Sequence, residues 1–314
     1  MKKKVCKLIK DFRFNNFLSL EKLEALKKES AVSTSLIIPA LNEASTIGKI
    51  VAFINEKLSK QHSIVDEIIV MDGTSEDATV ATAEKAGAKV FNVNTIGPEV
   101  PGMGKGVGLW KSQFISQSDI LIFIDADIIN FDERFVCGLL GPLLSDQEIY
   151  FIKAYYRRPL VLGTEYYENF GGRVTEILMR PLLNAFIPEL SFIKQPLSGE
   201  YAVRRNVLNE LPFWSGYGVE TGLLLEMFFR FGLSHIAQVD MENRCHRNRN
   251  VKELGMMSNC IIQVFFTLLE RYGYISLNHH AYKLFHDEYN FSKSESHDIE
   301  LPSRKSMEYK LLKE

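Results

Sequence analysis

The sequence predicts an α/β protein with a mostly parallel, Rossmann-like sheet flanked by helices and a helical C-terminal region. Short apolar runs bounded by polar residues, each typical of a buried strand, occur at residues 35–38, 67–71, 88–93 and 119–124. Helical periodicity lies between or beside them, at residues 45–58, 76–87 and 105–117. Strands that alternate with helices imply right-handed crossovers and a parallel sheet covered on both faces.

The second half of the chain is less regular. Strands are expected at residues 150–156, 200–204 and 235–239, and helices at residues 174–186, 219–231 and 254–272. We divide the chain into an N-terminal helical extension, a main domain with a first and a second half, a C-terminal part with a basic loop and helices, and a polar tail that we expect to be mobile. Their ranges are 1–33, 34–240 (halves 34–130 and 131–240), 241–291 and 292–314.

Composition excludes several classes of protein. Apolar residues make up 46% and charged residues 24%, which is typical of a globular protein, and the net charge of -2 gives no basis for nucleic-acid binding. The longest apolar run, residues 260–269, is about half the length that crosses a bilayer. The four cysteines are scattered and form no metal-binding pair. We therefore expect a cytoplasmic protein with reduced thiols and no membrane partner.

The most informative motif is Asp125-Ala126-Asp127, which follows an apolar strand. Two carboxylates at the exit of a buried strand are costly unless a positive charge lies beside them. Mg²⁺, or Mn²⁺, fits, because such ions are held by one or two carboxylates together with substrate phosphates. The alternative is that Asp127 caps the next helix while Asp125 faces solvent.

Loops after the other strands suggest a nucleotide site, because ligands bind beyond the carboxyl ends of the strands. The loop at residues 39–43 follows the first strand, and Glu43 is available to a ribose hydroxyl, although it also suits the start of a helix. Asp72 ends the second strand, where it would lie beside a base. The glycine-rich residues 102–106 precede a helix, and Lys105 there would meet a diphosphate, without the spacing of a P-loop.

Two further segments are candidate anion sites. The basic run at residues 244–249 contains Arg244 and His246, and guanidinium groups bind phosphate or carboxylate in bidentate fashion. A single histidine such as His246 is more often a structural residue than a ligand. Residues 171–175 place glycines and Arg173 at the start of a helix, where anions bind readily. Two anion sites would suit two phosphorylated substrates.

Together these motifs resemble the glucosyl-3-phosphoglycerate synthases, retaining glycosyltransferases with the GT-A fold. The resemblance runs from about residue 33 to residue 272 and rests on the motifs at residues 39–43, 104–106, 125–127, 156–159, 171–175, 195–201, 216–220 and 246–248. The chain departs from the family at Asn42, Ala126 and Cys245, where Asp, Ser and an acidic residue are common. These departures leave the acceptor preference and the metal affinity open.

The resemblance implies a role for each matching residue. Contacts to the nucleotide-sugar fall to Pro39, Ala40, Leu41, Glu43, Gly73, Lys105, Asp125 and Ala126, to which we add Asp72. The metal would be held by Asp127 and His246, and the donor glucose would lie among Leu197, Tyr217 and Glu220. The acceptor would be bound by Gly172, Arg173, Thr175 and Asn248, to which we add Arg244 from the basic run. The catalytic set is then Asp127, Lys105, Glu220, Leu197 and Tyr217.

The expected reaction transfers glucose from UDP-glucose to the 2-hydroxyl of D-3-phosphoglycerate with retention of configuration, in a Mg²⁺-dependent homodimer. Open alternatives are a GDP or mannose donor, a free glycerate acceptor, a sugar nucleotidyltransferase and a non-catalytic binding module. A nucleotidyltransferase normally carries its glycine-rich signature directly after the first strand, where this chain has residues 39–43. A front-face mechanism is favoured over a double displacement, for which Glu220 is the candidate nucleophile.

Overall fold

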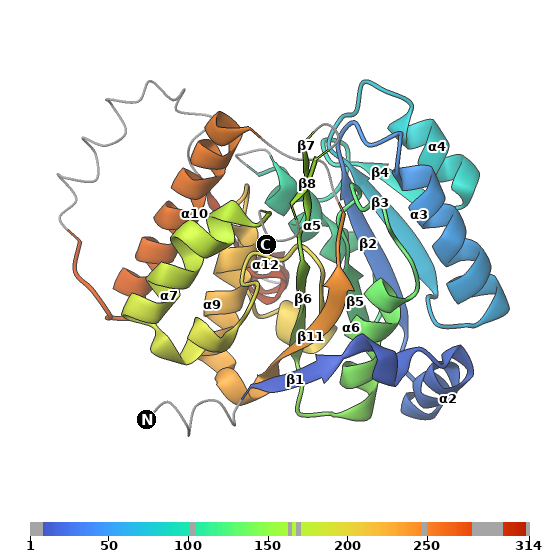
Figure 1. Ribbon diagram of the computed structural model, residues 1–314, viewed down its shortest axis with the longest axis horizontal. Coiled ribbons are helices and arrows are strands. Elements are labelled where there is room, and N and C mark those ends of the chain that lie inside the picture. Colours follow the sequence, from blue (N-terminus) through green and yellow to red (C-terminus); the bar gives the residue numbers. More distant parts are fainter. Residues whose placement is uncertain are drawn as a thin grey trace.

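The computed structural model describes residues 9–100, 104–162, 165–167, 171–245, 250–277 and 298–311. Within these ranges the central sheet has eight strands in the order β1-β11-β6-β9-β5-β2-β3-β4 (Figure 1). All neighbours are parallel except β9, which is antiparallel to both β5 and β6. The strands are β1 (Lys10–Arg13), β2 (Thr34–Ala40), β3 (Glu67–Asp72), β4 (Lys89–Asn92), β5 (Ile120–Phe123), β6 (Phe151–Arg157), β9 (Tyr201–Arg204) and β11 (Ile236–Asn243). The predicted α/β fold with a mostly parallel sheet is confirmed.

Helices cover both faces of the sheet. Successive side chains of a strand point to opposite faces, so Ile37 of β2 joins one apolar core while Leu36 and Ile38 join the other. Helices α5, α7, α9 and α10 pack on the first core, and α2, α3 and α6 on the second (Figure 1). The helices are α2 (Leu20–Ser30), α3 (Ile47–Phe53), α4 (Thr79–Ala86), α5 (Lys105–Ile115), α6 (Arg134–Ser145), α7 (Arg180–Phe186), α8 (Arg205–Leu208), α9 (Val219–Phe231), α10 (Val251–Arg271) and α12 (Arg304–Leu311).

Shorter elements complete the chain. Two predicted helices are longer than their α-helical parts, because α3 continues into the π-helix η2 and α7 is preceded by the π-helix η3. The short helices are η1 (Phe14–Phe17), η2 (Ile54–Gln61), η3 (Thr175–Met179), η4 (Pro188–Phe192) and η5 (Leu233–His235). Two small antiparallel pairs are β7 (Leu160–Leu162) with β8 (Glu165–Tyr167), and β10 (Phe213–Trp214) with β12 (Glu300–Leu301). In the described part of the chain, no helix is long and apolar enough to span a membrane.

The N-terminal segment is only partly helical. Helix α2 was expected, and Ser19 caps it by accepting a hydrogen bond from the N–H of Lys22 at 3.4 Å. Residues Lys10–Arg13 instead form β1, an edge strand that pairs in parallel with β11. Three of its four residues are charged, so the strand has no apolar run that would identify it in the sequence.

The C-terminal segment differs most from the prediction. Residues 292–314 were expected to be a mobile tail, which stays a prediction, but residues 298–311 contain strand β12 and helix α12. Strand β12 pairs with β10, which lies much earlier in the sequence, and Leu301 keeps only 1% of its surface exposed. The order of this segment comes from contacts with residues about 90 positions earlier, which local polarity does not reveal.

Candidate active site

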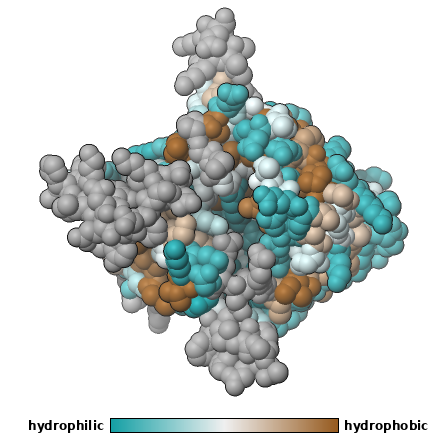
Figure 2. All heavy atoms as spheres, turned by 90° about the horizontal axis from the view of Figure 1, so that it is seen from above, coloured by the Kyte–Doolittle hydropathy of each residue, from teal (hydrophilic) through white to brown (hydrophobic). Residues whose placement is uncertain are grey.

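The carboxyl ends of β2, β3 and β5 meet at one edge of the sheet, at the top of Figure 1. Seen from this edge, hydrophilic residues border a hollow near the centre of the described surface (Figure 2). The loops that follow these strands carry most of the predicted donor residues.

The loops after β2 and β3 are tied together by hydrogen bonds. Asn42 has a left-handed backbone with φ of 56°; its N–H donates to Ser75 Oγ at 2.9 Å, and its Oδ1 accepts from the N–H of Glu76 at 2.9 Å. The N–H of Gly73 donates to the carbonyl of Ala40 at 2.9 Å. Leu41 stays 54% exposed beside this junction, so its apolar side chain is available to the face of a base.

Asp72 lies at the end of β3, where the sequence predicted it. It is 2% exposed, and its carboxylate accepts hydrogen bonds from the N–H groups of Thr74 and Ser75 at 3.1 Å. The side chain therefore shapes the turn after β3, and its contact with a base stays a prediction.

Lys105 lies at the start of α5, where the backbone passes very close to another segment. A Cβ atom at Gly106 would be 1.7 Å from the carbonyl oxygen of Trp214, and Gly104 has φ of 122°, so both positions require glycine. This approach directs Lys105 Nζ to Asp125 Oδ1 at 2.5 Å and to Glu220 Oε1 at 2.6 Å. Burial alone would lower the pKa of Lys105, but the two carboxylates outweigh it and raise this pKa well above its ordinary value.

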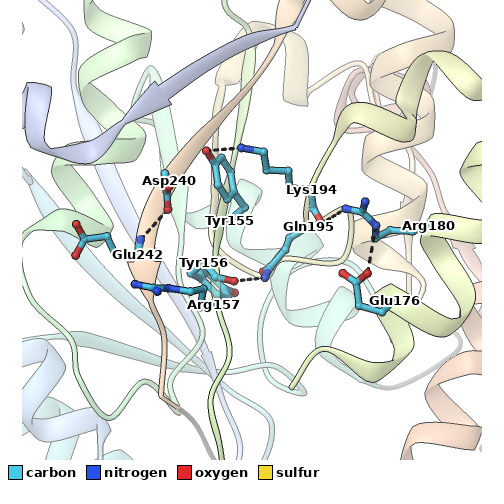
Figure 3. Close-up of a pocket in the computed structure, with 9 residues that line it drawn as sticks. All are labelled: Tyr155, Tyr156, Arg157, Glu176, Arg180, Lys194, Gln195, Asp240 and Glu242. Carbon is cyan, nitrogen blue, oxygen red and sulfur yellow. Dashed lines mark hydrogen bonds and ion pairs between the residues drawn. The ribbon is translucent and has the colours of Figure 1, made fainter. Parts of the chain in front are cut away.

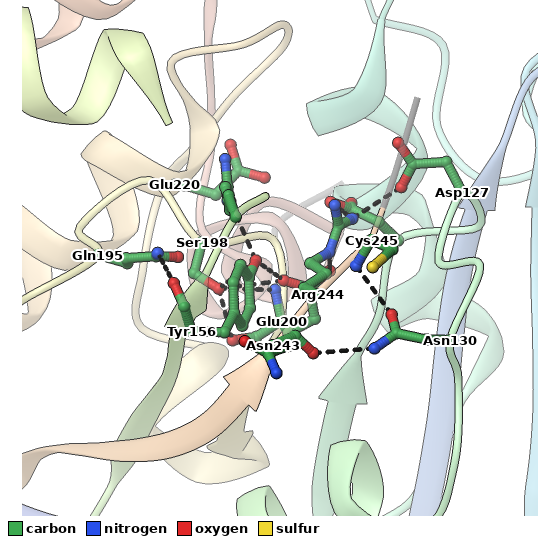
Figure 4. A network of polar contacts seen from close by, with 12 residues as sticks. Asp127, Asn130, Tyr156, Gln195, Ser198, Glu200, Glu220, Asn243, Arg244 and Cys245 are labelled. Carbon is green, nitrogen blue, oxygen red and sulfur yellow. Dashed lines mark hydrogen bonds and ion pairs between the residues drawn. The ribbon is translucent and has the colours of Figure 1, made fainter. Parts of the chain in front are cut away.

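Arg244, at the end of β11, joins three carboxylates (Figure 4). Its Nη2 lies 3.1 Å from Asp125 Oδ2 and 2.7 Å from Asp127 Oδ1, and its Nε lies 2.9 Å from Glu200 Oε1. Burial opposes ionisation of Asp125, but Lys105 and Arg244 more than offset it, so the pKa of Asp125 is held below its ordinary value. The predicted motif at residues 125–127 is thus the centre of a charged cluster.

Glu200 is a site residue that the sequence did not single out. Its side chain is fully buried, it pairs with Arg244, and it accepts hydrogen bonds from Ser198 Oγ at 3.1 Å and from the hydroxyl of Tyr156. It therefore fixes Arg244 beside the two aspartates. The available signal was its position inside the motif at residues 195–201, where a charged residue directly precedes strand β9.

Lys153 was also missed. It projects from β6, is 1% exposed, and donates to the carbonyl of Ser198 at 2.8 Å. Burial lowers its pKa to about 8, against the opposing effect of Glu220. A lysine inside an otherwise apolar strand was the signal that would have identified it.

The predicted acceptor segment lies next to this cluster. The N–H of Gly171 donates to the carbonyl of Arg158 at 2.9 Å, and Arg158 Nη2 donates to the hydroxyl of Tyr156 at 3.0 Å. Gly172 has φ of 74°, and Thr175 begins η3 with 4% of its surface exposed. Tyr156 therefore joins the acceptor segment to Glu200 and Arg244. The remaining predicted residues Leu197 and Tyr217 are half-buried, whereas His246 and Asn248 lie outside the described residues.

A separate pocket of about 350 Å³ lies between β6, β11 and the η3–α7 segment (Figure 3). Two of the cations that line it are paired, Arg180 with Glu176 at 3.3 Å and Lys194 with Asp11 at 3.1 Å. The described residues that line it, none of them a predicted site residue, are Tyr155, Tyr156, Arg157, Glu176, Arg180, Lys194, Gln195, Asp240 and Glu242.

Comparisons with known proteins agree with this fold. The sequence profile of "Glycosyl transferase family 2" matches residues 35–194. The glucosyl-3-phosphoglycerate synthase of Petrotoga mobilis is 44% identical over 272 residues, which cover 86% of this chain and 84% of the relative. The chain belongs to the glucosyl-3-phosphoglycerate synthases. The predicted GT-A fold and glycosyltransferase class are thereby confirmed.

Solved structures support the same membership. A glucosyl-3-phosphoglycerate synthase from Mycobacterium tuberculosis, in complex with Mn²⁺, UDP-glucose and phosphoglyceric acid, matches with a TM-score of 0.78 and 39% identity over 95% of this chain and 99% of that one. The mannosyl-3-phosphoglycerate synthase of Rubrobacter xylanophilus has a TM-score of 0.81 but 30% identity, over 95% of this chain and 96% of that one. By sequence, this glucosyl-3-phosphoglycerate synthase family member lies nearer the glucosyl enzyme.

Proposed function

We propose that the protein transfers glucose from UDP-glucose to the 2-hydroxyl of D-3-phosphoglycerate and retains the anomeric configuration. The observation that carries this proposal is the cluster in which Lys105 and Arg244 hold Asp125 and Asp127, with the glycine-rich segment 171–175 beside it. The cluster provides a donor site at the sheet edge, and the segment provides an anion site for the acceptor. The Mycobacterium tuberculosis relative bound to UDP-glucose and phosphoglyceric acid supports both assignments.

On the donor side, we assign the nucleoside to the joined loops after β2 and β3. Leu41 is exposed for contact with the base, while Asp72 and the Gly73 hydrogen bond keep the turn in shape. Lys105 stays charged and faces the diphosphate. The complete donor set is Pro39, Ala40, Leu41, Glu43, Asp72, Gly73, Lys105, Asp125 and Ala126, with Leu197, Tyr217 and Glu220 at the glucose.

A divalent cation fits beside this set. Both aspartates keep 25% of the side chain exposed, but Asp127 is held by one cation, Arg244, whereas Asp125 is held by two, so Asp127 is the better source of a hard carboxylate oxygen. The described residues contain no cluster of three or more metal-binding side chains, so the ion would also need donor phosphates and His246, which lies outside these residues. When bound, Mg²⁺ or Mn²⁺ would neutralise charge on the leaving diphosphate.

On the acceptor side, we assign the phosphate of 3-phosphoglycerate to Gly172, Arg173, Thr175 and Asn248. Gly172 has a left-handed backbone directly before a helical segment, and the first backbone N–H groups of such a segment suit an anion. Arg244 was a further candidate for this role. Its guanidinium is 2% exposed and is shared among three carboxylates, so its proposed role is now to hold those carboxylates.

The position of Glu220 favours a front-face mechanism. Its carboxylate is 6% exposed and is engaged by Lys105 at 2.6 Å, which makes it a poor nucleophile for a double displacement. In the front-face step, the bond from the anomeric carbon to the diphosphate oxygen breaks while the bond to the 2-hydroxyl oxygen forms on the same face. The hydroxyl proton passes to the departing diphosphate. The enzyme contributes by holding both substrates in this geometry.

The test is a matrix of donors and acceptors in the presence of Mg²⁺, with nucleotide release and the anomeric proton of the product measured. UDP-glucose with D-3-phosphoglycerate should give the fastest release of UDP and an α-linked product. GDP-mannose, GDP-glucose and free glycerate serve as competing substrates. Faster turnover with any of these, or an inverted product, would contradict the proposal.

We further propose a cytoplasmic homodimer. Ile177 and Val251 are 77% and 78% exposed, and such apolar positions are suited to a partner surface. The apolar face of α10 contributes less than expected, because Ile261, Val264 and Leu268 are buried within the same chain. Sedimentation equilibrium at several protein concentrations tests the dimer, and a single monomer mass throughout would contradict it.

A further inference from the structure

Residues 298–303, here called the C-terminal strap, lie against the back of the donor site. Ser215 donates its N–H to the carbonyl of Ile299 at 2.9 Å and accepts the N–H of Ile299 on its side-chain oxygen at 2.9 Å. Trp110 Nε1 donates to the carbonyl of Pro302 at 2.7 Å, which fixes the strap on helix α5. The strap is thus held by hydrogen bonds to two segments of the main domain.

Strand β10 connects the strap with Lys105. One side of β10 pairs with β12, and the carbonyl of Ser215 accepts the N–H of Val107 at 3.0 Å on the other side. A Cβ atom at Gly104 would be 3.1 Å from the same carbonyl oxygen. The strap contacts β10, and β10 contacts the first turn of α5. This series of contacts ends at Lys105, which faces the donor.

Asp298, at the first position of the strap, meets the turn that carries Tyr217. It is 6% exposed, and the N–H of Gly218 donates to its Oδ2 at 2.5 Å. A Cβ atom at Gly216 would lie 2.1 Å from its Oδ1, so the turn can approach the carboxylate only because it has glycine there.

The same contact caps helix α9 from a distance. The first N–H groups of a helix have no partner within it, and an acidic side chain normally supplies one. Gly218 is the N-cap of α9 and has no side chain, so Asp298 supplies the carboxylate from 80 residues later in the chain. Glu220 lies in the first turn of α9 and reaches Lys105 from there.

We propose that Asp298 is a positioning residue for glucosyl transfer, because it fixes the turn and the first helical turn from which Tyr217 and Glu220 reach the donor. This inference rests on the proposed donor site. A buried carboxylate is an energetically unfavourable cap. Burial raises the pKa of Asp298 to about 6, and the like charge of Glu220 on α9 acts in the same direction. Cys260 of α10 and the N–H groups of Gly216 and Gly218 oppose this effect and favour ionisation. A purely structural contact at this place could be apolar at lower cost.

The test compares Asp298→Ala and Asp298→Asn with a control in the same strap, Glu300→Gln. Within the described residues, the side chain of Glu300 makes its hydrogen bonds to Arg271, one of them at 2.8 Å, and none to the turn. We expect Asp298→Ala to lower kcat by roughly 10- to 100-fold while KM for the acceptor changes by less than about twofold. Asp298→Asn should restore most of kcat, because Oδ1 of asparagine still accepts the Gly218 N–H. Glu300→Gln should leave kcat at the wild-type value.

Thermal unfolding of each variant separates positioning from loss of fold. Equal kcat in Asp298→Ala and Glu300→Gln, or no recovery in Asp298→Asn, would overturn the proposal. The ratio of the kcat of each variant to the kcat of the wild type is measured with the acceptor that the wild-type protein uses best. UDP binding is measured by calorimetry. If the acceptor assignment is wrong, the wild-type protein will prefer another acceptor. If the role of Asp298 is wrong, the ratios of variant kcat to wild-type kcat will stay at one.

Discussion

The carboxylates near the donor site fall into two groups that differ in how their charge is balanced. The paired group is formed by Asp125, Asp127, Glu200 and Glu220. Each member contacts Lys105 or Arg244, and Asp125 contacts both. Asp298 stands apart, since its described partners are backbone N–H groups and a thiol. Lys105 and Arg244 hold the pKa of Asp125 below its ordinary value, whereas burial without a cation raises the pKa of Asp298 to about 6. The donor site therefore combines a cluster of paired charges with a carboxylate, Asp298, whose charge is sensitive to pH.

The largest effect is expected from Arg244→Met, which breaks the paired group. It would leave three carboxylates without their shared cation, so we expect more than about 1,000-fold loss of kcat and a fall of about 3–5 kcal/mol in the free energy of unfolding. Turnover assays and urea denaturation measure the two effects.

Arg230→Met is the matched control for Arg244→Met. Arg230 pairs with the buried Glu226 on α9, away from the paired group. It should cost stability with kcat changed less than about threefold. Activity above a tenth of wild type in Arg244→Met would show that the paired group does not need Arg244.

A smaller effect is expected from Glu220→Gln, which removes one of the two charges that hold Lys105. Asp125 still pairs with the lysine, so we expect kcat to fall by roughly 10- to 100-fold with retention of configuration preserved. Steady-state kinetics, NMR of the product and mass spectrometry of the protein provide the measurements. Complete loss of turnover together with a trapped glycosyl-enzyme would refute the front-face mechanism.

Arg173→Ala tests a cation outside both groups. If Arg173 binds the phosphate of the acceptor, KM for 3-phosphoglycerate should rise by roughly 10-fold or more, while KM for UDP-glucose stays within about twofold. Lys194→Ala, at the separate pocket, is the control and should leave both values unchanged. An unaltered acceptor KM in Arg173→Ala would argue against the assignment of the acceptor segment.

The sequence predicted the positions of the paired carboxylates better than the role of Asp298. Apolar runs and strand exits located Asp125, Asp127 and Lys105 at one edge of the sheet, because these signals are local. The partners of Arg244 were not predictable in this way, since two carboxylates from the loop after β5 and a third that directly precedes β9 meet only in the folded chain. The basic run instead suggested an external anion.

The strap was missed for a related reason. Residues 298–301 read Asp-Ile-Glu-Leu, which gives two apolar residues and no helical or strand pattern of useful length. Its order depends on β10, a two-residue strand, and on glycines at residues 216 and 218 that make room for Asp298. Pairing between such short and distant segments leaves almost no local signal, and a polar composition then suggests a mobile tail.

The smallest effect, and the one that separates the two groups most directly, is the pH dependence of stability in Asp298→Asn. The pKa of Asp298 is about 6 in the folded protein, above the value of about 4 in an unfolded chain. The folded state therefore binds more protons between these values, and the contribution of Asp298 to stability is fully present below about pH 4 and is lost as the pH rises through about 6. The loss amounts to about 2–3 kcal/mol. Asparagine does not titrate, so the unfolding free energy of Asp298→Asn minus that of wild type should increase from about pH 4 to about pH 7. Asp125 has the opposite sign, since its lowered pKa gives stability that is lost only under strongly acidic conditions. Denaturation curves across this pH range measure the difference, and a constant offset between the two proteins would mean that Asp298 is paired as well as the other carboxylates are.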